Sequence, residues 1–396
     1  MADSKEIVIS GSTLSPDFIQ ELLPAVEQTA LHYHLSFLCL GGFPQLERMI
    51  RDQALKTQML FGSSEAVLLK CAGTSSNLVT SLFPILIKAV EKNKPKLAVI
   101  YLEKAKTWIE DIISAVDDMV KRYEQQTKSV KTCTSDVYEE QNQTEGKLKE
   151  HTVEMKALED ALAKLELELN KNVNDIEEIQ EEIEKSTQEL QDLIIKSAKS
   201  HSYLQVLFGY NRKYNNAAIR AKQAELTPLV HEMDSLRKQG WDIKNKQIDL
   251  QMKLAICNIQ QGEIPSPVHL TEVQRCLDQI RKILVDLKNF WEKVSFTLET
   301  LKDKTFAGDK LIEDLKDMKE EFLNSIEDAK QYWQTFGAGC QRAQNIFSMQ
   351  SRDAYKFLEI NPSSLSQDER NKQYTSIMEK LKKINPQGLC KAAITE

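Results

Sequence analysis

The clearest pattern along the chain is a seven-residue repeat of apolar positions that begins at Leu148. One heptad position is apolar seven times in succession and reads Leu148, Met155, Leu162, Leu169, Ile176, Ile183 and Leu190. The companion position is mixed and reads His151, Leu158, Leu165, Asn172, Ile179, Ser186 and Leu193. This repeat predicts a long coiled-coil helix, in which polar seam residues such as Asn172 fix the register at some cost in stability.

The repeat resumes further along the chain and predicts a second helix of similar length. One seam position reads Leu229, Leu236, Ile243, Leu250 and Cys257, and the other reads Ile219, Leu226, Met233 and Leu254. Each arm has about 45 residues, or roughly 65 to 70 Å of helix. Gly209-Tyr210-Asn211 supplies a turn between the arms. We therefore expect an antiparallel coiled-coil hairpin whose tip lies far from the main body.

The segment between the arms differs in composition from the rest of the chain. Residues Leu193 to Ala224 include no Asp or Glu, although the whole chain carries a formal charge of -7. Basic side chains flank an apolar, aromatic patch in this segment. The predicted contact residues are Lys199, Tyr203, Leu204, Val206, Leu207, Phe208, Tyr210, Arg212, Lys213 and Tyr214. At the end of a hairpin this patch lies beyond the reach of the protein's own core, so we interpret it as a contact site.

Three partners are compatible with such a tip. Basic groups beside aromatic rings suit an anionic membrane surface. The same composition suits a protein partner. In the third interpretation, two tips bury each other in a dimer. The expected assembly is a homo- or hetero-oligomer.

The remainder of the chain predicts an all-α fold, an elongated bundle of long helices with the hairpin protruding from it. We expect an apolar region of short packed helices in residues 1–94, interrupted at residues such as Gly62 and Gly73. A long bundle helix is expected in 95–146, the hairpin in 147–260 with its tip near 197–214, and further bundle helices and a tail in 268–396. Residues 271–301 carry a helical apolar stripe: Val273, Leu277, Ile280, Leu284, Leu287, Trp291, Val294 and Leu298. The apolar runs at 29–43 and 77–90 are shorter than the roughly 20 residues that span a bilayer, so we interpret them as core helices. In the alternative, one of them is stored in the soluble form and released into lipid.

Charge and motif content narrow the function classes. A sequence pI near 5.6 argues against a general nucleic-acid-binding protein. No nucleophile elbow, phosphate loop or zinc pattern occurs, so we expect neither catalysis nor a cofactor or metal. His32 and His34 are two positions apart, which points them away from each other on a helix. The first residues lack the features of a signal peptide, so the cytoplasm is the expected location, with unconventional release as the alternative.

The helical organisation from Ser15 to Phe347 resembles that of the haemolysin BL and cytolysin A superfamily of α-helical pore-forming toxins. The resemblance is carried by Ala105-Lys106-Thr107-Trp108-Ile109 at the start of a long helix and by Gln331-Tyr332-Trp333 in a late one. It implies a bundle of very long helices, an apolar segment that enters the membrane, and oligomerisation. The apolar segment of this chain is shorter than a typical toxin tongue, which a partner subunit or a peripheral role would accommodate.

Two functions follow from these patterns. In the first, a non-enzymatic protein, like an α-pore-forming toxin or one of its subunits, docks on a membrane through the hairpin tip. In the second, a cytosolic coiled-coil scaffold or tether binds a protein partner through the same tip.

Overall fold

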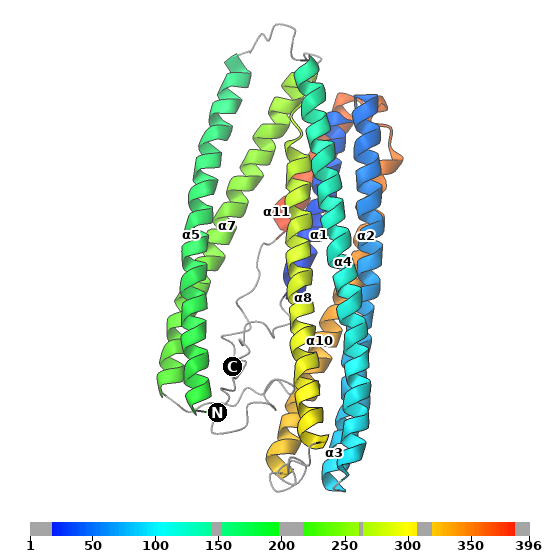
Figure 1. Cartoon of the computed structure of the whole chain (residues 1–396). Coiled ribbons are helices and arrows are strands. Elements are labelled where there is room, and N and C mark those ends of the chain that lie inside the picture. Colours follow the sequence, from blue (N-terminus) through cyan, green and yellow to red (C-terminus); the bar gives the residue numbers. More distant parts are fainter. Residues whose placement is uncertain are drawn as a thin grey trace.

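The computed structural model describes residues 18–92, 94–144, 153–197, 217–260, 264–306 and 319–384, and these contain helices and no strand. The long helices are α1 (Phe18–Leu40), α2 (Pro44–Asn77), α4 (Pro95–Thr144), α5 (Val153–Ser197), α7 (Ala217–Gln260), α8 (Val268–Phe306) and α10 (Lys319–Asp353). The shorter elements are the π-helical η2 (Leu78–Leu82), α3 (Phe83–Glu91), the 3-10 turns η3 (Lys356–Glu359) and η4 (Pro362–Ser364), and α11 (Gln367–Lys383). The helices run along one common direction (Figure 1). The predicted fold class, an elongated all-α bundle, is confirmed.

The antiparallel packing of α4 on α8 forms the long axis of the bundle. Three polar contacts are spaced along this pair of helices. Two are ion pairs, in which Lys106 Nζ lies 2.6 Å from Glu299 Oε2 and Lys288 Nζ lies 2.6 Å from Asp117 Oδ1. The third is a hydrogen bond from Gln274 Nε2 to Thr134 Oγ1 at 2.6 Å. All eight residues of the predicted α8 stripe are buried. Since α4 has 50 residues, the pair gives the molecule a length of about 75 Å.

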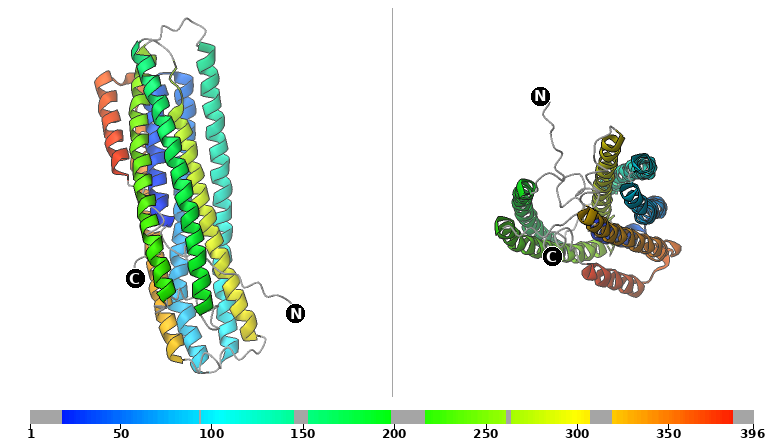
Figure 2. Two further views of the ribbon diagram at one scale, coloured as in Figure 1. Left: turned by 90° about the vertical axis from the view of Figure 1, so that its left-hand side faces the viewer. Right: turned by 90° about the horizontal axis from the view of Figure 1, so that it is seen from below.

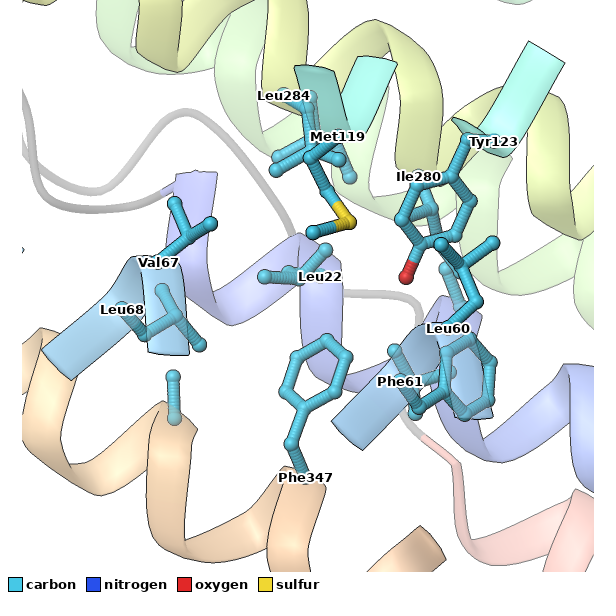
Figure 3. Close-up of a cluster of buried hydrophobic side chains, with 14 of the residues drawn as sticks. Leu22, Leu60, Phe61, Val67, Leu68, Met119, Tyr123, Ile280, Leu284 and Phe347 are labelled. Atoms are coloured by element: carbon cyan, nitrogen blue, oxygen red, sulfur yellow. The ribbon is translucent and has the colours of Figure 1, made fainter. Parts of the chain in front are cut away.

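Side chains from five helices meet between α1, α2, α4, α8 and α10. Figure 3 shows this cluster, in which Leu22 of α1 lies among Phe61 of α2, Tyr123 of α4, Ile280 of α8 and Phe347 of α10. The Phe61 and Phe347 rings meet edge to face with centroids 5.7 Å apart. Further along α8 and α10, the rings of Trp291 and Trp333 are 5.5 Å apart and fully buried. Aromatic burial therefore fixes α10 against the rest of the bundle.

The prediction of short helices throughout the apolar N-terminal region is wrong for α2, which continues for 34 residues. Gly62 and Gly73 were expected to interrupt it, but both lie on the exposed side of the helix with open space around them. A glycine inside a helix costs only about 1 kcal/mol relative to alanine, and the buried face of α2 outweighs this cost. The helix changes its winding only at η2, directly before Pro84.

Helices α5 and α7 form an antiparallel pair that lies on one side of the bundle (Figures 1 and 2). The half of α7 that follows Gly240 is docked on the bundle, where Trp241, Ile248 and Met252 join the main core. The other half moves away from α8, toward the end of the hairpin at residues 197 and 217 (Figure 1). The hairpin thus has a docked base and an outer half that packs on itself.

The C-terminal segment fastens the base of the hairpin to α1. The Trp241 indole donates a hydrogen bond to the Leu381 carbonyl at 3.2 Å, and the Tyr374 hydroxyl lies 2.8 Å from Asp249 Oδ1. Arg370 donates to the carbonyls of Leu38 and Pro362 at 3.2 and 2.9 Å. Helix α11 therefore bridges α7 and α1.

One polar contact sets the register of α5 against α7. Asn172 is buried, and its Nδ2 donates to the Leu236 carbonyl at 2.9 Å. A Cβ at Gly240 would overlap Asn172 Oδ1. The absence of a side chain at Gly240 is therefore what admits the amide into the seam, in agreement with the register role predicted for Asn172.

Gly240→Ala should destabilise the hairpin because Asn172 must turn away and lose its bond to Leu236. The expected loss is about 1 to 3 kcal/mol of unfolding free energy, the cost of an unsatisfied buried polar group. Urea unfolding followed by circular dichroism measures it. Gly62→Ala is the matched control and should gain about 1 kcal/mol from helix propensity alone. Equal gains in both variants would contradict the register role of Asn172.

Candidate functional site

The predicted contact residues lie outside the described part of the chain. Residues 198–216 are not described, and this range includes every one of them: Lys199, Tyr203, Leu204, Val206, Leu207, Phe208, Tyr210, Arg212, Lys213 and Tyr214. Their role stays a prediction. The described helices on either side, α5 and α7, determine where this segment begins and ends.

The outer half of the hairpin has an apolar core of its own. Ile183, Leu190, Leu226, Val230 and Met233 are buried there, separate from the main core, with Ile176, Ile179 and Leu229 packed against them. The predicted seam positions Leu226 and Met233 are buried as expected, whereas Leu236 and Leu250 are only half-buried. Val230, which was not predicted as a seam residue, is also buried, because α7 turns its Leu226, Val230 and Met233 side chains toward α5.

An ion-pair cluster joins the two arms near their free end. Lys222 Nζ lies 2.5 Å from Glu189 Oε2 of α5 and 2.8 Å from Glu225 Oε2 of α7. The hydrogen bond from Lys222 holds the pKa of Glu189 below its ordinary value, and the two carboxylates raise the pKa of Lys222. Lys222 lies in the acid-free segment of the sequence, but its ammonium group pairs with Glu189, which precedes that segment, and with Glu225, which follows it. This lysine therefore stabilises the hairpin and is not free to bind a partner.

A second group of cations was not predicted from the sequence. Lys88, Lys92, Lys94 and Lys96 are exposed at the turn between α3 and α4. This turn lies at the end of the bundle toward which the hairpin arms run from their base (Figure 1). The signal was present in the run Lys92-Asn93-Lys94-Pro95-Lys96, but only the fold brings it to the same end of the molecule as the ends of α5 and α7 at residues 197 and 217.

The main body also holds a buried polar layer where α1 crosses α8. The rings of His32 and His269 are stacked with centroids 6.1 Å apart, and both side chains are fully buried. Burial, together with the charges of His269 and Arg275, lowers the pKa of His32 well below its ordinary value. Burial alone lowers the pKa of His269 to about 4. His34 points to the other side of α1, as its spacing from His32 predicts, and its ring stacks on Phe357.

The described ranges of the chain include neither a metal site nor a membrane-spanning helix. No cluster of three or more His, Cys, Asp or Glu there could hold a metal ion. None of the helices described there combines the length and apolar character needed to cross a membrane.

Comparison with known proteins links the chain to bacterial toxin components at a coarse level. No family model and no curated protein sequence matches it. Among solved structures, SmhA, from the tripartite α-pore-forming toxin Smh of Serratia marcescens, is similar at 12% identity over 85% of this chain and 96% of that chain, with a TM-score of 0.41. The HblL1 toxin component of Bacillus cereus is similar at 12% identity over 84% and 97%, with a TM-score of 0.42. SmhA is a component of an α-pore-forming toxin, the class whose helical organisation this sequence resembles. At these TM-scores the likeness carries no conclusion about assembly or activity.

Met233→Ala should loosen the outer half of the hairpin and leave the bundle intact, because the two apolar cores are separate. The expected local cost is about 2 to 4 kcal/mol for the cavity. Hydrogen exchange should accelerate in the outer parts of α5 and α7 and stay unchanged in α8. Met59→Ala is the matched control, since Met59 is 73% exposed on α2. Simultaneous loosening of α8 would show that the hairpin and the bundle unfold as one unit.

Proposed function

We propose that this protein is a non-enzymatic membrane-binding protein that docks on anionic lipid through the tip of its α5–α7 hairpin. Tyr203, Leu207, Phe208 and Tyr210 enter the interface, while Lys199, Arg212 and Lys213 bind head groups. The observation that carries the proposal is that an acid-free, aromatic segment lies in the sequence between two helices that pack against each other as antiparallel arms.

The packing of the arms supports this role. Met233 and Leu226 bury the apolar faces of the arms against α5, so the hairpin needs no contact with the bundle to hold its outer half together. Lys222 adds a bridge close to the free end. A stiff support of this kind, with its apolar faces already buried, suits a role in which the segment that joins the arms contacts a membrane.

The charge distribution of the bundle supports an anionic partner. The α3–α4 turn adds the exposed cations Lys88, Lys92, Lys94 and Lys96 at the end of the bundle toward which α5 and α7 run from their base (Figure 1). Each basic residue close to an anionic bilayer contributes about 1 kcal/mol of attraction. Several such residues on one end of an otherwise acidic protein orient it toward the membrane.

As in the toxins that the sequence resembles, oligomerisation and helix rearrangement follow docking. The first contact is peripheral, through side chains at the tip.

Docking is tested by flotation of the full chain with vesicles of phosphatidylserine and phosphatidylcholine at neutral pH. Arg212→Glu combined with Lys213→Glu should weaken binding by at least about 30-fold, because two attractions of about 1 kcal/mol each are lost. Phe208→Asp should also abolish flotation, since a carboxylate cannot enter the interface. Vesicles of phosphatidylcholine alone should bind neither variant.

The matched control is Lys128→Glu combined with Lys131→Glu on α4, which changes the net charge by the same amount at two exposed positions. It should bind as the unmodified protein does. Equal losses in both double variants would reduce the effect to net charge and contradict a tip site. Absence of binding to anionic vesicles would overturn the membrane proposal in favour of a protein tether, and binding without dye release would restrict the function to docking.

A further inference from the structure

Several buried polar atoms of the described core have no hydrogen-bond partner there, among them Trp291 Nε1 and Tyr355 Oη, but His32 and His269 are the two such side chains that stack on each other and can take up a proton. Nδ1 of His32 and both ring nitrogens of His269 are buried without a hydrogen-bond partner among the described residues. The next residue of α1, Tyr33, shows the usual arrangement, since its hydroxyl lies 2.9 Å from Thr57 Oγ1, which also accepts from Gln126 at 3.0 Å. Buried polar groups are normally hydrogen-bonded, and exceptions mark functional sites or stored strain.

The fold creates this pair by a specific crossing. α1 and α8 run antiparallel, with Cys276 Sγ 3.7 Å from Gln28 Oε1 one turn away from the His32–His269 stack. The pair is therefore enclosed within the interface of the two helices. A proton on either ring would place a charge in this interface, and protons on both rings would place two like charges about 6 Å apart.

We propose that His32 and His269 form an acid-sensitive lock, which holds α1 against α8 while both rings are neutral and releases α1 when they are protonated. The lock concerns α1 because this helix is bound through both of its sides. On the other side of α1, His34 Nε2 lies 2.9 Å from Gln373 Oε1 of α11, and its ring stacks on Phe357. Burial lowers the pKa of His34 to about 4.

The direction of the pH dependence follows from the neutral state of the closed form. In water a histidine has a pKa near 6.5, whereas the pKa of His269 is about 4 in the closed form. Between these values the open form binds more protons, so the closed form loses stability as the pH falls from about 6.5 toward 4. Above pH 6.5 the lock is fully closed. Two such histidines change the opening constant by up to about 100-fold per pH unit.

Charged and titratable groups surround this part of α1 from the neighbouring helices. They are Glu27 of α1, Asp52 of α2, Lys244 of α7, Glu272, Arg275 and Cys276 of α8, and Lys380 of α11. The positive charge of Arg275 acts in the same direction as burial on His32.

Glu272 acts in the opposite direction. It lies 3.2 Å from Lys244 Nζ and 2.9 Å from Arg275, while burial raises its pKa. A carboxyl with a raised pKa takes up its proton in the closed form first, which favours closure as the pH falls. The same proton neutralises the partner of two cations beside the histidines. Glu272→Gln should therefore steepen the opening, which separates its contribution from that of the lock.

The test is hydrogen exchange of the full chain between pH 7.5 and 4.5, corrected for the intrinsic pH dependence of exchange and carried out without lipid. In the unmodified protein, the opening constant of α1 should rise as the pH falls below 6.5, while α5 and α7 keep their protection in the outer hairpin. In the double variant His32→Gln and His269→Gln, the opening constant of α1 should rise less steeply, by up to about 100-fold less for each pH unit. His231→Gln is the matched control, since His231 is exposed on α7, and it should behave as the unmodified protein.

An unchanged pH profile in the double variant would overturn the lock, as would constant protection of α1 in the unmodified protein. A measurement on the unmodified protein decides the matter if the double variant does not fold. Among the signals of its six ¹³C-labelled imidazoles, three should remain neutral down to about pH 5, those of His32, His34 and His269. Titration of all six near 6.5 would overturn the proposal.

Release of α1 supplies the rearrangement that follows docking, and this consequence alone rests on the proposed function. Vesicle flotation at neutral pH tests the tip with the lock closed. Exchange without lipid tests the lock with no membrane present. Failure of either experiment therefore leaves the other result standing.

Discussion

The fold depends on burial of the apolar stripe of α8. This stripe extends over the length of the helix, from Val273 to Leu298, and it is covered by α4, by α1 and, around Trp291, by α10. The long antiparallel contact with α4 fixes the axis of the molecule, and its polar ends, from Lys106–Glu299 to Gln274–Thr134, exclude a shift by one turn. The contact with α1 completes the core. Any change in how α1 lies on α8 therefore exposes apolar surface on both helices.

The polar residues of the core divide into two groups with different consequences. Tyr33, Thr57 and Gln126 satisfy one another, and such a network rigidifies the contacts of α1 with α2 and α4. His32 and His269 contribute stacking and burial without a complete set of hydrogen bonds. The His32–His269 layer stabilises the packing of α1 on α8 only as long as both rings stay uncharged. The contact of α1 with α8 is thus conditional on pH, while the contact with α2 is not.

One-sided patterns in the sequence predicted the elements that obey them. Trp291 and Leu298 belong to a stripe with a single apolar face, and such a stripe determines both the helix and its buried side. The same reasoning failed for Gly62, because its effect on a helix depends on whether the residue faces the core or solvent. Contacts between residues far apart in the sequence could not be predicted, because nothing near His32 in the sequence indicates that His269 stacks on it. Composition predicted a contact segment around Phe208, and this stays a prediction because the segment lies outside the described residues.

One half of α7 is attached to the bundle and the other half packs only on α5, and Gly240 lies at the boundary between them. On one side of it, Trp241 and Met252 belong to the main core, so this half of α7 follows any movement of α1 or α11. On the other side, Met233 and Val230 belong to a core shared only with α5. A movement of α1 would therefore reach the base of the hairpin through Trp241 and Leu381 without unfolding its outer half. Because Asn172 fixes the register of α5 against α7 at this boundary, we expect the two arms to move together.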